Sequence, residues 1–260
     1  MMLTILLAAL QAAAPVGPVE PAVNRFDRCA TLARTDPTAA HVDAARWIKS
    51  GGTWRAQQCD GLAYTSEGKF VTAAEAFANA ARAAQLAHDP RAAEYFAQAG
   101  NAWLAAGEAS KARAALDSAL LLGTLGGLQL GEAQLDHARV LVAAGEMDGA
   151  RNDIDRALQS AGDDPLAWLL SATLARRMGN PTRAATDIAE ALKRSPDDAS
   201  VQLEAGNIAA VSGNEARAKE AWGNAARIAP DTAVGRHAKA ALAQFGATAS
   251  PSATKPAEGR

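Results

Sequence analysis

The chain has 260 residues, a formal net charge of −2 and a hydrophobic fraction of 49%, while aromatic residues make up only 5%. A net charge of −2 gives no sign of the basic surface that nucleic-acid binding requires, and we expect no nucleic-acid partner. Alanine dominates the apolar residues and is the strongest helix former. The composition therefore favours many short, closely packed helices over a β-sheet.

The first 14 residues, MMLTILLAALQAAA, form an apolar run that ends in small residues, although no Lys or Arg precedes it. The run is too short to cross a bilayer as a helix but has the length of a signal-peptide core. We predict a signal peptide over residues 1–14 and export to the periplasm, with no membrane span left after its removal. The alternative is an apolar tail on a chain that is not exported. Residues 15–24 contain three prolines and are predicted to be a linker.

Cys29 and Cys59 are the only cysteines. An even cysteine count in an exported protein favours a disulfide, and we predict one between these two residues. Two separate free thiols remain the alternative if the chain is not exported. No metal site is expected, because two cysteines without a histidine in a ligand pattern cannot complete a tetrahedral shell.

Two helices are predicted before residue 53. A short one around residues 26–33 carries Cys29. A second runs from Pro37 to Ser50, because Asp36 and Pro37 form a helix start and Gly51-Gly52 forms a stop.

A pattern of small and large residues then recurs five times. Glycines lie 39, 38, 34 and 34 residues apart, at Gly68, Gly107, Gly145, Gly179 and Gly213. Nine residues after each glycine stands a large apolar residue, namely Phe77, Leu116, Ile154, Ile188 and Trp222. Seven residues before each glycine stands a small one, namely Gly61, Gly100, Ala138, Ala172 and Gly206. Internal repetition at this period is typical of stacked helical units.

Each position of the pattern has a steric reason. The repeated glycine ends the first helix of a pair in a left-handed conformation and lets the chain reverse. The small residues allow two antiparallel helices to cross closely. The large residue is expected to fill the space between one pair and the next. Pro196 and Pro230 end second helices, and Asp198 caps a helix start.

This pattern resembles the 34-residue tetratricopeptide repeat. The resemblance implies an all-α, right-handed superhelical solenoid, with five repeats within residues 53–232, at 54–87, 93–126, 131–164, 165–198 and 199–232. Residues 25–52 and 233–246 would then be capping helices, because a solenoid must cover its end faces. Ala175 and Ala209 depart from the family pattern, where an aromatic residue is usual. Residues 247–260 are small, polar and proline-containing, and are predicted to be a disordered tail.

The search for catalytic chemistry finds no motif. No metal-protease, nucleophile-elbow, phosphate-loop or dinucleotide-binding pattern occurs, and the four histidines lie far apart in sequence. The pairs Asp163-Asp164 and Asp197-Asp198 precede helix starts, which favours capping over acid–base work. We therefore expect a protein that is not an enzyme and that has no catalytic residue, cofactor or metal.

Candidate binding residues follow from the resemblance, because the first helix of each repeat lines a concave groove in that family. They are Arg55, Gln58, Asn101, Arg139, Thr173, Arg176, Arg177 and Asn207. Asn101 and Asn207 occupy a position where relatives bond a peptide backbone, and Arg139 and Arg176 suit a carboxylate. Arg139, Arg176 and Arg177 are expected to lack a comparable set of carboxylates on the same helix faces, although Glu132 is close enough to pair with one of them. The ligand is therefore expected to be acidic or to offer a free C-terminus. The alternative is that these are ordinary solvated side chains.

The resulting hypothesis is a non-enzymatic scaffold that binds a peptide segment or a partner protein in its groove, in the periplasm. The alternative is an accessory subunit that is permanently docked on an envelope enzyme or a transport assembly. The residues leave the partner and the oligomeric state open.

Overall fold

The computed structural model describes residues 22–248, which form thirteen α-helices and no β-strand. This confirms the predicted all-α repeat fold. The helices are α1 (Ala22–Thr35), α2 (Pro37–Lys49), α3 (Trp54–Ser66), α4 (Phe70–Leu86), α5 (Ala92–Ala105), α6 (Ala109–Leu121), α7 (Gly127–Ala143), α8 (Met147–Ser160), α9 (Pro165–Arg177), α10 (Pro181–Arg194), α11 (Ala199–Val211), α12 (Glu215–Ile228) and α13 (Ala233–Thr248). The predicted signal peptide, and most of the predicted linker and tail, lie outside the described residues.

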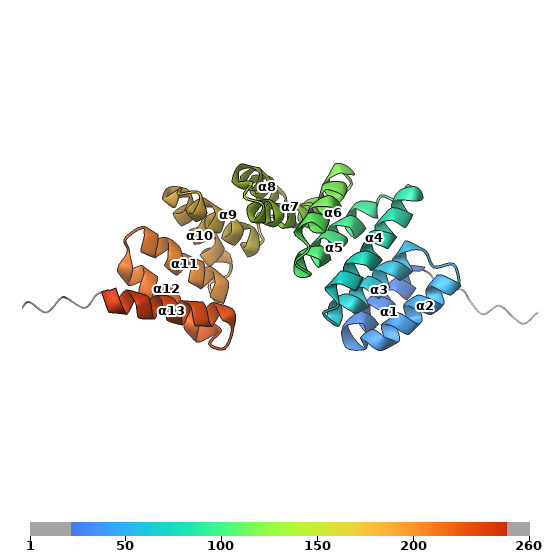
Figure 1. Ribbon diagram of the computed structural model, residues 1–260, viewed down its shortest axis with the longest axis horizontal. Helices are drawn as coiled ribbons and strands as arrows, with labels where there is room; N and C mark the ends of the chain where they lie inside the picture. The colour runs from blue at the N-terminus through green and yellow to red at the C-terminus, as the bar shows by residue number, and fades with distance from the viewer. Residues whose placement is uncertain (1–21, 249–260) are drawn as a thin grey trace, which may run out of the picture.

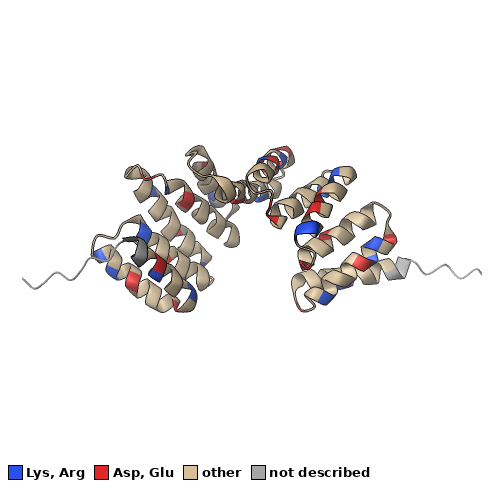
Figure 2. Ribbon diagram, turned by 180° about the vertical axis from the view of Figure 1, so that it is seen from behind, with Lys and Arg blue, Asp and Glu red and all other residues tan. Residues whose placement is uncertain are grey.

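Helices α3 to α12 form five pairs of consecutive helices, and each pair packs against the next. Figure 1 shows the pairs stacked into an arch, with α7 and α8 near its crown. Helices α1 and α2 cover the N-terminal end of the stack, and α13 covers the other end. Figure 2 shows acidic and basic residues interspersed along the helices.

Each first helix ends two residues before one of the five repeated glycines. All five have positive φ, between +72° and +81°. After Gly107, the Glu108 amide donates a hydrogen bond to the Trp103 carbonyl across the turn, at 2.9 Å. This bond satisfies a carbonyl at the end of α5 and lets α6 start in the reverse direction.

The small and large residues of the pattern meet where the two helices of a pair cross. A Cβ atom built on Gly61 would lie 2.6 Å from the Phe77 ring, and one on Gly206 would lie 2.4 Å from the Trp222 ring. The large residue was expected to fill the space between pairs. It does so, since Phe77 shares a cluster with Trp103 of the next pair. It also packs against the small residue of its own pair, Gly61.

Aspartates cap the helix starts that the sequence marks. The Asp36 carboxylate accepts from the Ala39 amide at 3.0 Å, and Asp164 accepts from the Leu166 amide at 2.9 Å. Asp198 accepts from the amide of Ser200 in the same way. Each bond satisfies an amide that the helix itself leaves unpaired.

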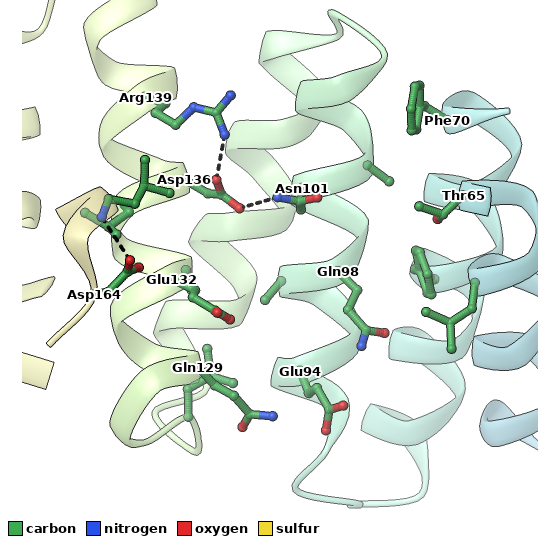
Figure 3. Close-up of a pocket in the computed structure, with 18 of the residues that line it drawn as sticks. Thr65, Phe70, Glu94, Gln98, Asn101, Gln129, Glu132, Asp136, Arg139 and Asp164 are labelled. Carbon is green, nitrogen blue, oxygen red and sulfur yellow. Dashed lines mark hydrogen bonds and ion pairs between the residues drawn. The ribbon is translucent and has the colours of Figure 1, made fainter. Parts of the chain in front are cut away.

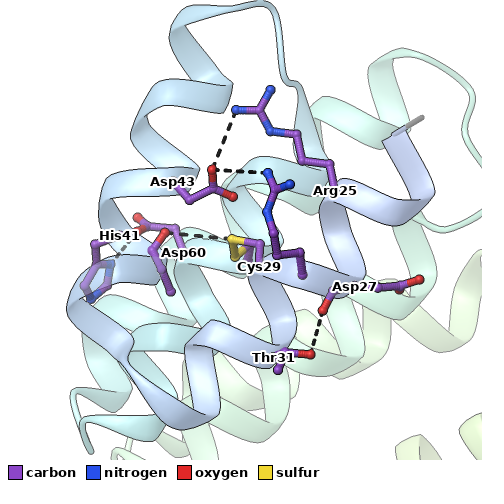
Figure 4. The surroundings of a disulfide bond; sticks show 10 residues. Arg25, Asp27, Cys29, Thr31, His41, Asp43 and Asp60 are labelled. Carbon is purple, nitrogen blue, oxygen red and sulfur yellow. Dashed lines mark hydrogen bonds and ion pairs between the residues drawn. A yellow bond between two sulfur atoms is a disulfide. The ribbon is translucent and has the colours of Figure 1, made fainter. Parts of the chain in front are cut away.

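At the N-terminal end, a disulfide joins Cys29 of α1 to Cys59 of α3, with the two Cα atoms 6.0 Å apart (Figure 4). Both cysteines are fully buried. Helix α1 is longer than predicted, because it begins at Ala22 and thus takes in the last residues of the predicted linker. At the other end, Trp222 and Phe245 pack edge to face and hold α13 on α12.

No helix within residues 22–248 has both the length and the apolar character needed to cross a bilayer.

Candidate functional site

The inner side of the arch contains a cavity of about 480 Å³, here called the main cavity. Helices α3, α4, α5, α7 and α9 contribute its lining, so it extends over more than one repeat. The lining residues are Leu62, Thr65, Phe70, Phe77, Glu94, Ala97, Gln98, Asn101, Ala102, Leu125, Gln129, Glu132, Ala133, Leu135, Asp136, Arg139, Asp164, Leu166 and Leu170.

Helical spacing explains why its polar lining gathers there. On α5 the polar lining residues are Glu94, Gln98 and Asn101, and on α7 they run from Gln129 through Glu132 and Asp136 to Arg139. Successive members on each helix lie three or four residues apart, which places them along one helix face. Figure 3 shows these two helices side by side, with Asn101 of α5 and Asp136 of α7 pointing toward each other.

One hydrogen-bonded chain links α5 to α7 along this lining. The Asn101 amide donates to the Asp136 carboxylate at 2.7 Å, and Arg139 donates to the other oxygen of Asp136 at 3.0 Å (Figure 3). Asn101 and Arg139 are thus oriented by a carboxylate that they share. Since the Arg139 side chain is 52% exposed, its remaining donors are open to solvent or to a ligand.

A smaller cavity of about 120 Å³, here called the side cavity, adjoins the main one between α7, α8 and α9. The two share Leu135, Arg139 and Leu170. Thr173 and Arg177 complete the polar lining of the side cavity, and Arg177 is exposed. Both cavities together are called the groove below.

The sequence-based candidates therefore separate into two sets. Asn101, Arg139, Thr173 and Arg177 line the groove, whereas the other four lie in neither cavity. Of these, Arg55 lies over the Phe26 ring at 5.1 Å, in the N-terminal part of the stack. Gln58 is buried and donates to Glu94 and Gln98 of the next repeat.

Arg176 and Asn207 belong to a partly buried network between repeats. Arg176 binds both oxygens of Glu204, at 2.6 and 3.1 Å, and Glu204 is buried. Asn207 donates to Glu204 and accepts from the Trp222 indole. The expectation that no carboxylates neutralise the arginines is wrong, because Asp136 pairs with Arg139 and Glu204 pairs with Arg176.

The sequence-based prediction missed several lining residues, notably Glu94, Gln98, Gln129 and Asp164, and it named Glu132 only as close enough to pair with one of the arginines. The spacing on α5 and α7 was a usable signal, because it places these polar residues on the same helix face as Asn101 and Arg139. Among the described residues no group of three or more His, Cys, Asp or Glu side chains is placed to hold a metal ion.

A family model described as tetratricopeptide repeat matches residues 169–233. No curated protein matches the chain. The fold is similar to that of PilW, described as a widely conserved type IV pilus biogenesis factor, with a TM-score of 0.68 and 19% identity over 82% of this chain and 96% of that one.

Two further solved structures have the same fold. One is PilF of Pseudomonas aeruginosa, with a TM-score of 0.67 and 16% identity over 84% of this chain and 98% of that one. The other is YrrB, described as a TPR protein with an unusual peptide-binding site, with a TM-score of 0.55 and 21% identity over 75% of this chain and 96% of that one. The repeated helix pairs with their glycine turns, the family match over residues 169–233 and these shared folds show that the chain has the fold of tetratricopeptide repeat proteins.

Proposed function

We propose that this protein is a non-enzymatic interaction scaffold that holds a peptide segment or a partner protein in the groove. The observation that carries the proposal is the main cavity itself, which opens on the inner side of the arch across several first helices. That YrrB is described as having a peptide-binding site supports a peptide as ligand.

The groove offers both kinds of contact that such a ligand needs. Leu135 and Phe77 form part of an apolar floor, and Leu166 presents a side chain that is 48% exposed. Apolar side chains of a ligand gain affinity by leaving water there. Asn101 and Arg139 lie beside this floor, already oriented by Asp136, and can bond a ligand's backbone or fix its register.

The proposal includes export to the periplasm. Two features support it, the signal-peptide pattern over residues 1–14 and the disulfide between Cys29 and Cys59, which is typical of oxidising compartments. N-terminal sequencing of the protein from the envelope fraction of its host should find a start after the apolar run. An intact Met1 in a cytoplasmic fraction would refute export.

A larger side chain placed in the main cavity tests whether the ligand binds there. Gln129 is exposed, lines the main cavity and forms no hydrogen bond with the described residues, so Gln129→Trp should obstruct the cavity without removing a hydrogen bond. The matched control is Gln159→Trp, an exposed glutamine of α8 that lines neither cavity. Peptides selected from a random library on the wild-type protein should lose affinity for Gln129→Trp by about tenfold or more.

Circular dichroism melting must first show that both variants are folded. Peptides that bind Gln129→Trp as tightly as the wild type would place the ligand outside the main cavity. Equal losses in both tryptophan variants would mean that the effect is unspecific.

A second candidate function is a subunit permanently docked through the outer edge of the stack. Leu86 and Leu121 are 84% and 87% exposed, and a bond from Thr124 to the Pro90 carbonyl brings the chain segments after α4 and α6 together. The description of PilW as a pilus biogenesis factor is consistent with a role in an assembly. A stoichiometric partner that stays bound to Gln129→Trp but is lost from Leu121→Lys would favour this candidate.

A further inference from the structure

The charges that line the main cavity are strongly unbalanced. Four carboxylates line it, those of Glu94, Glu132, Asp136 and Asp164, against the single guanidinium of Arg139. The chain as a whole has a net charge of only −2. The imbalance is thus a local property of this cavity.

Three of the four carboxylates already have a structural partner. Asp136 binds Asn101 and Arg139, and Asp164 caps α9 by accepting from the Leu166 amide. Glu94 accepts from the Gln58 amide at 3.3 Å. None of these three is fully available to a ligand.

Glu132 differs, because it forms no hydrogen bond or ion pair with the residues that the structure describes. Figure 3 shows its carboxylate pointing from α7 into the space that faces α5, between Gln129 and Asp136. Glu132 is exposed, but desolvation by the surrounding protein still raises its pKa, and the negative charges of Asp164 and Asp136 raise it further. An approaching cation would relieve this repulsion.

The apolar part of the lining suits a long side chain with a charged end. Leu62, Leu125, Leu166 and Leu170 line the same cavity as Glu132. Lysine and arginine bury their aliphatic stems against apolar surface while the charged head reaches a polar partner. An acidic side chain would instead meet the negative charges of Glu94, Glu132 and Asp164. The one positive charge of the lining, that of Arg139, is already balanced by Asp136.

We propose that the main cavity selects an extended peptide segment that carries a lysine or arginine, whose charged head binds at Glu132 and whose stem packs on the apolar lining. This inference rests on the proposed function, because it names the ligand chemistry of the same groove. It reverses the sequence-based expectation of an acidic ligand for this cavity.

The experiment selects binders from a random peptide library in which Lys, Arg, Asp and Glu are equally frequent, on immobilised folded protein at low ionic strength. Selected sequences should be enriched in Lys or Arg. The Kd of the best lysine-containing peptide should rise by about tenfold in Glu132→Lys, a factor that corresponds to about 1.4 kcal/mol. Added salt should weaken its binding to the wild type, because both charges are partly exposed.

The control is Glu75→Lys, which makes the same charge change at an exposed residue of α4 that lines neither cavity. Its Kd should match that of the wild type. An equal loss in both lysine variants would overturn the inference, because the effect would then come from net charge.

Failure of the inference and failure of the proposed function give different results. Neutral or acidic binders that Gln129→Trp abolishes and Glu132→Lys does not affect would leave the groove as the binding site and overturn its preference for a cation. Binders that tolerate Gln129→Trp, or the absence of any binder, would overturn both together.

Discussion

At the scale of single residues, the fold depends on pairs of one small and one large side chain. Gly206 and Trp222 show the principle, because the glycine of α11 lets the indole of α12 lie directly against its backbone. Glycine is otherwise a poor helix residue and costs about 1 kcal/mol relative to alanine. The fold accepts this cost where two helices must approach closely.

Two glycine-to-alanine substitutions should therefore have opposite effects. Gly206→Ala should destabilise the protein, since overpacking costs about 1–3 kcal/mol and outweighs the gain in helix propensity. Gly223→Ala should stabilise it by up to about 1 kcal/mol, because a Cβ at Gly223 of α12 meets no atom within 4 Å. Urea unfolding measures both changes. Stabilisation by both substitutions would mean that Trp222 can move aside at no cost.

At the scale of helices, the fold was predictable because helix ends and helix crossings depend on short-range sequence patterns. Each helix end and each crossing depends on residues close in sequence, such as Gly107 at the end of α5 or Asp164 at the start of α9, and the sequence shows these directly. The partners of the arginines were not predictable in this way. Arg176 pairs with Glu204, which lies 28 residues further along the chain, and this pairing depends on how one repeat is rotated against the next.

The same limit applies to the candidate site. Family position pointed to Asn101 and Arg139, which line the main cavity, but it also pointed to Gln58, which is buried between repeats. Whether a polar side chain on a first helix reaches the groove or the neighbouring repeat depends on the curvature of the arch. That curvature arises from the sum of many contacts between pairs.

One contact between helices should make stability depend on pH. His137 of α7 lies 2.5 Å from Asp153 of α8 and 3.1 Å from Asp117 of α6. The hydrogen bond to Asp153 raises the pKa of His137 above its usual 6.5, against the lowering effect of burial. Protonated His137 is therefore favoured in the folded state. Its stabilising contribution is complete below the unfolded pKa and is lost as the pH rises through the folded pKa.

His137→Gln should consequently lower stability more at about pH 6 than at about pH 8. Urea unfolding of both proteins at each pH gives the difference, and the subtraction cancels the titrating groups that the substitution leaves unchanged. An equal loss at both pH values would show that His137 acts only through packing.

At the scale of the whole molecule, stability should be local, because each pair contacts mainly its neighbours in the stack. In such an arrangement a change at one end weakens that end without unfolding the rest. The disulfide lies at one end and links α1 to α3 across 30 residues of sequence. Its contribution should therefore be confined to the N-terminal part of the arch.

Reduction of the disulfide provides the test. Closing a loop of this length stabilises a fold by about 3–4 kcal/mol in the chain-entropy model. Hydrogen exchange after reduction should thus rise in α1 to α3 and stay unchanged in α9 to α12. The double variant Cys29→Ala/Cys59→Ala should show the same pattern and respond no further to reductant, which controls for effects of the reductant itself. Faster exchange spread evenly over all helices would show instead that the stack unfolds as a single cooperative unit, and that the disulfide stabilises the whole arch.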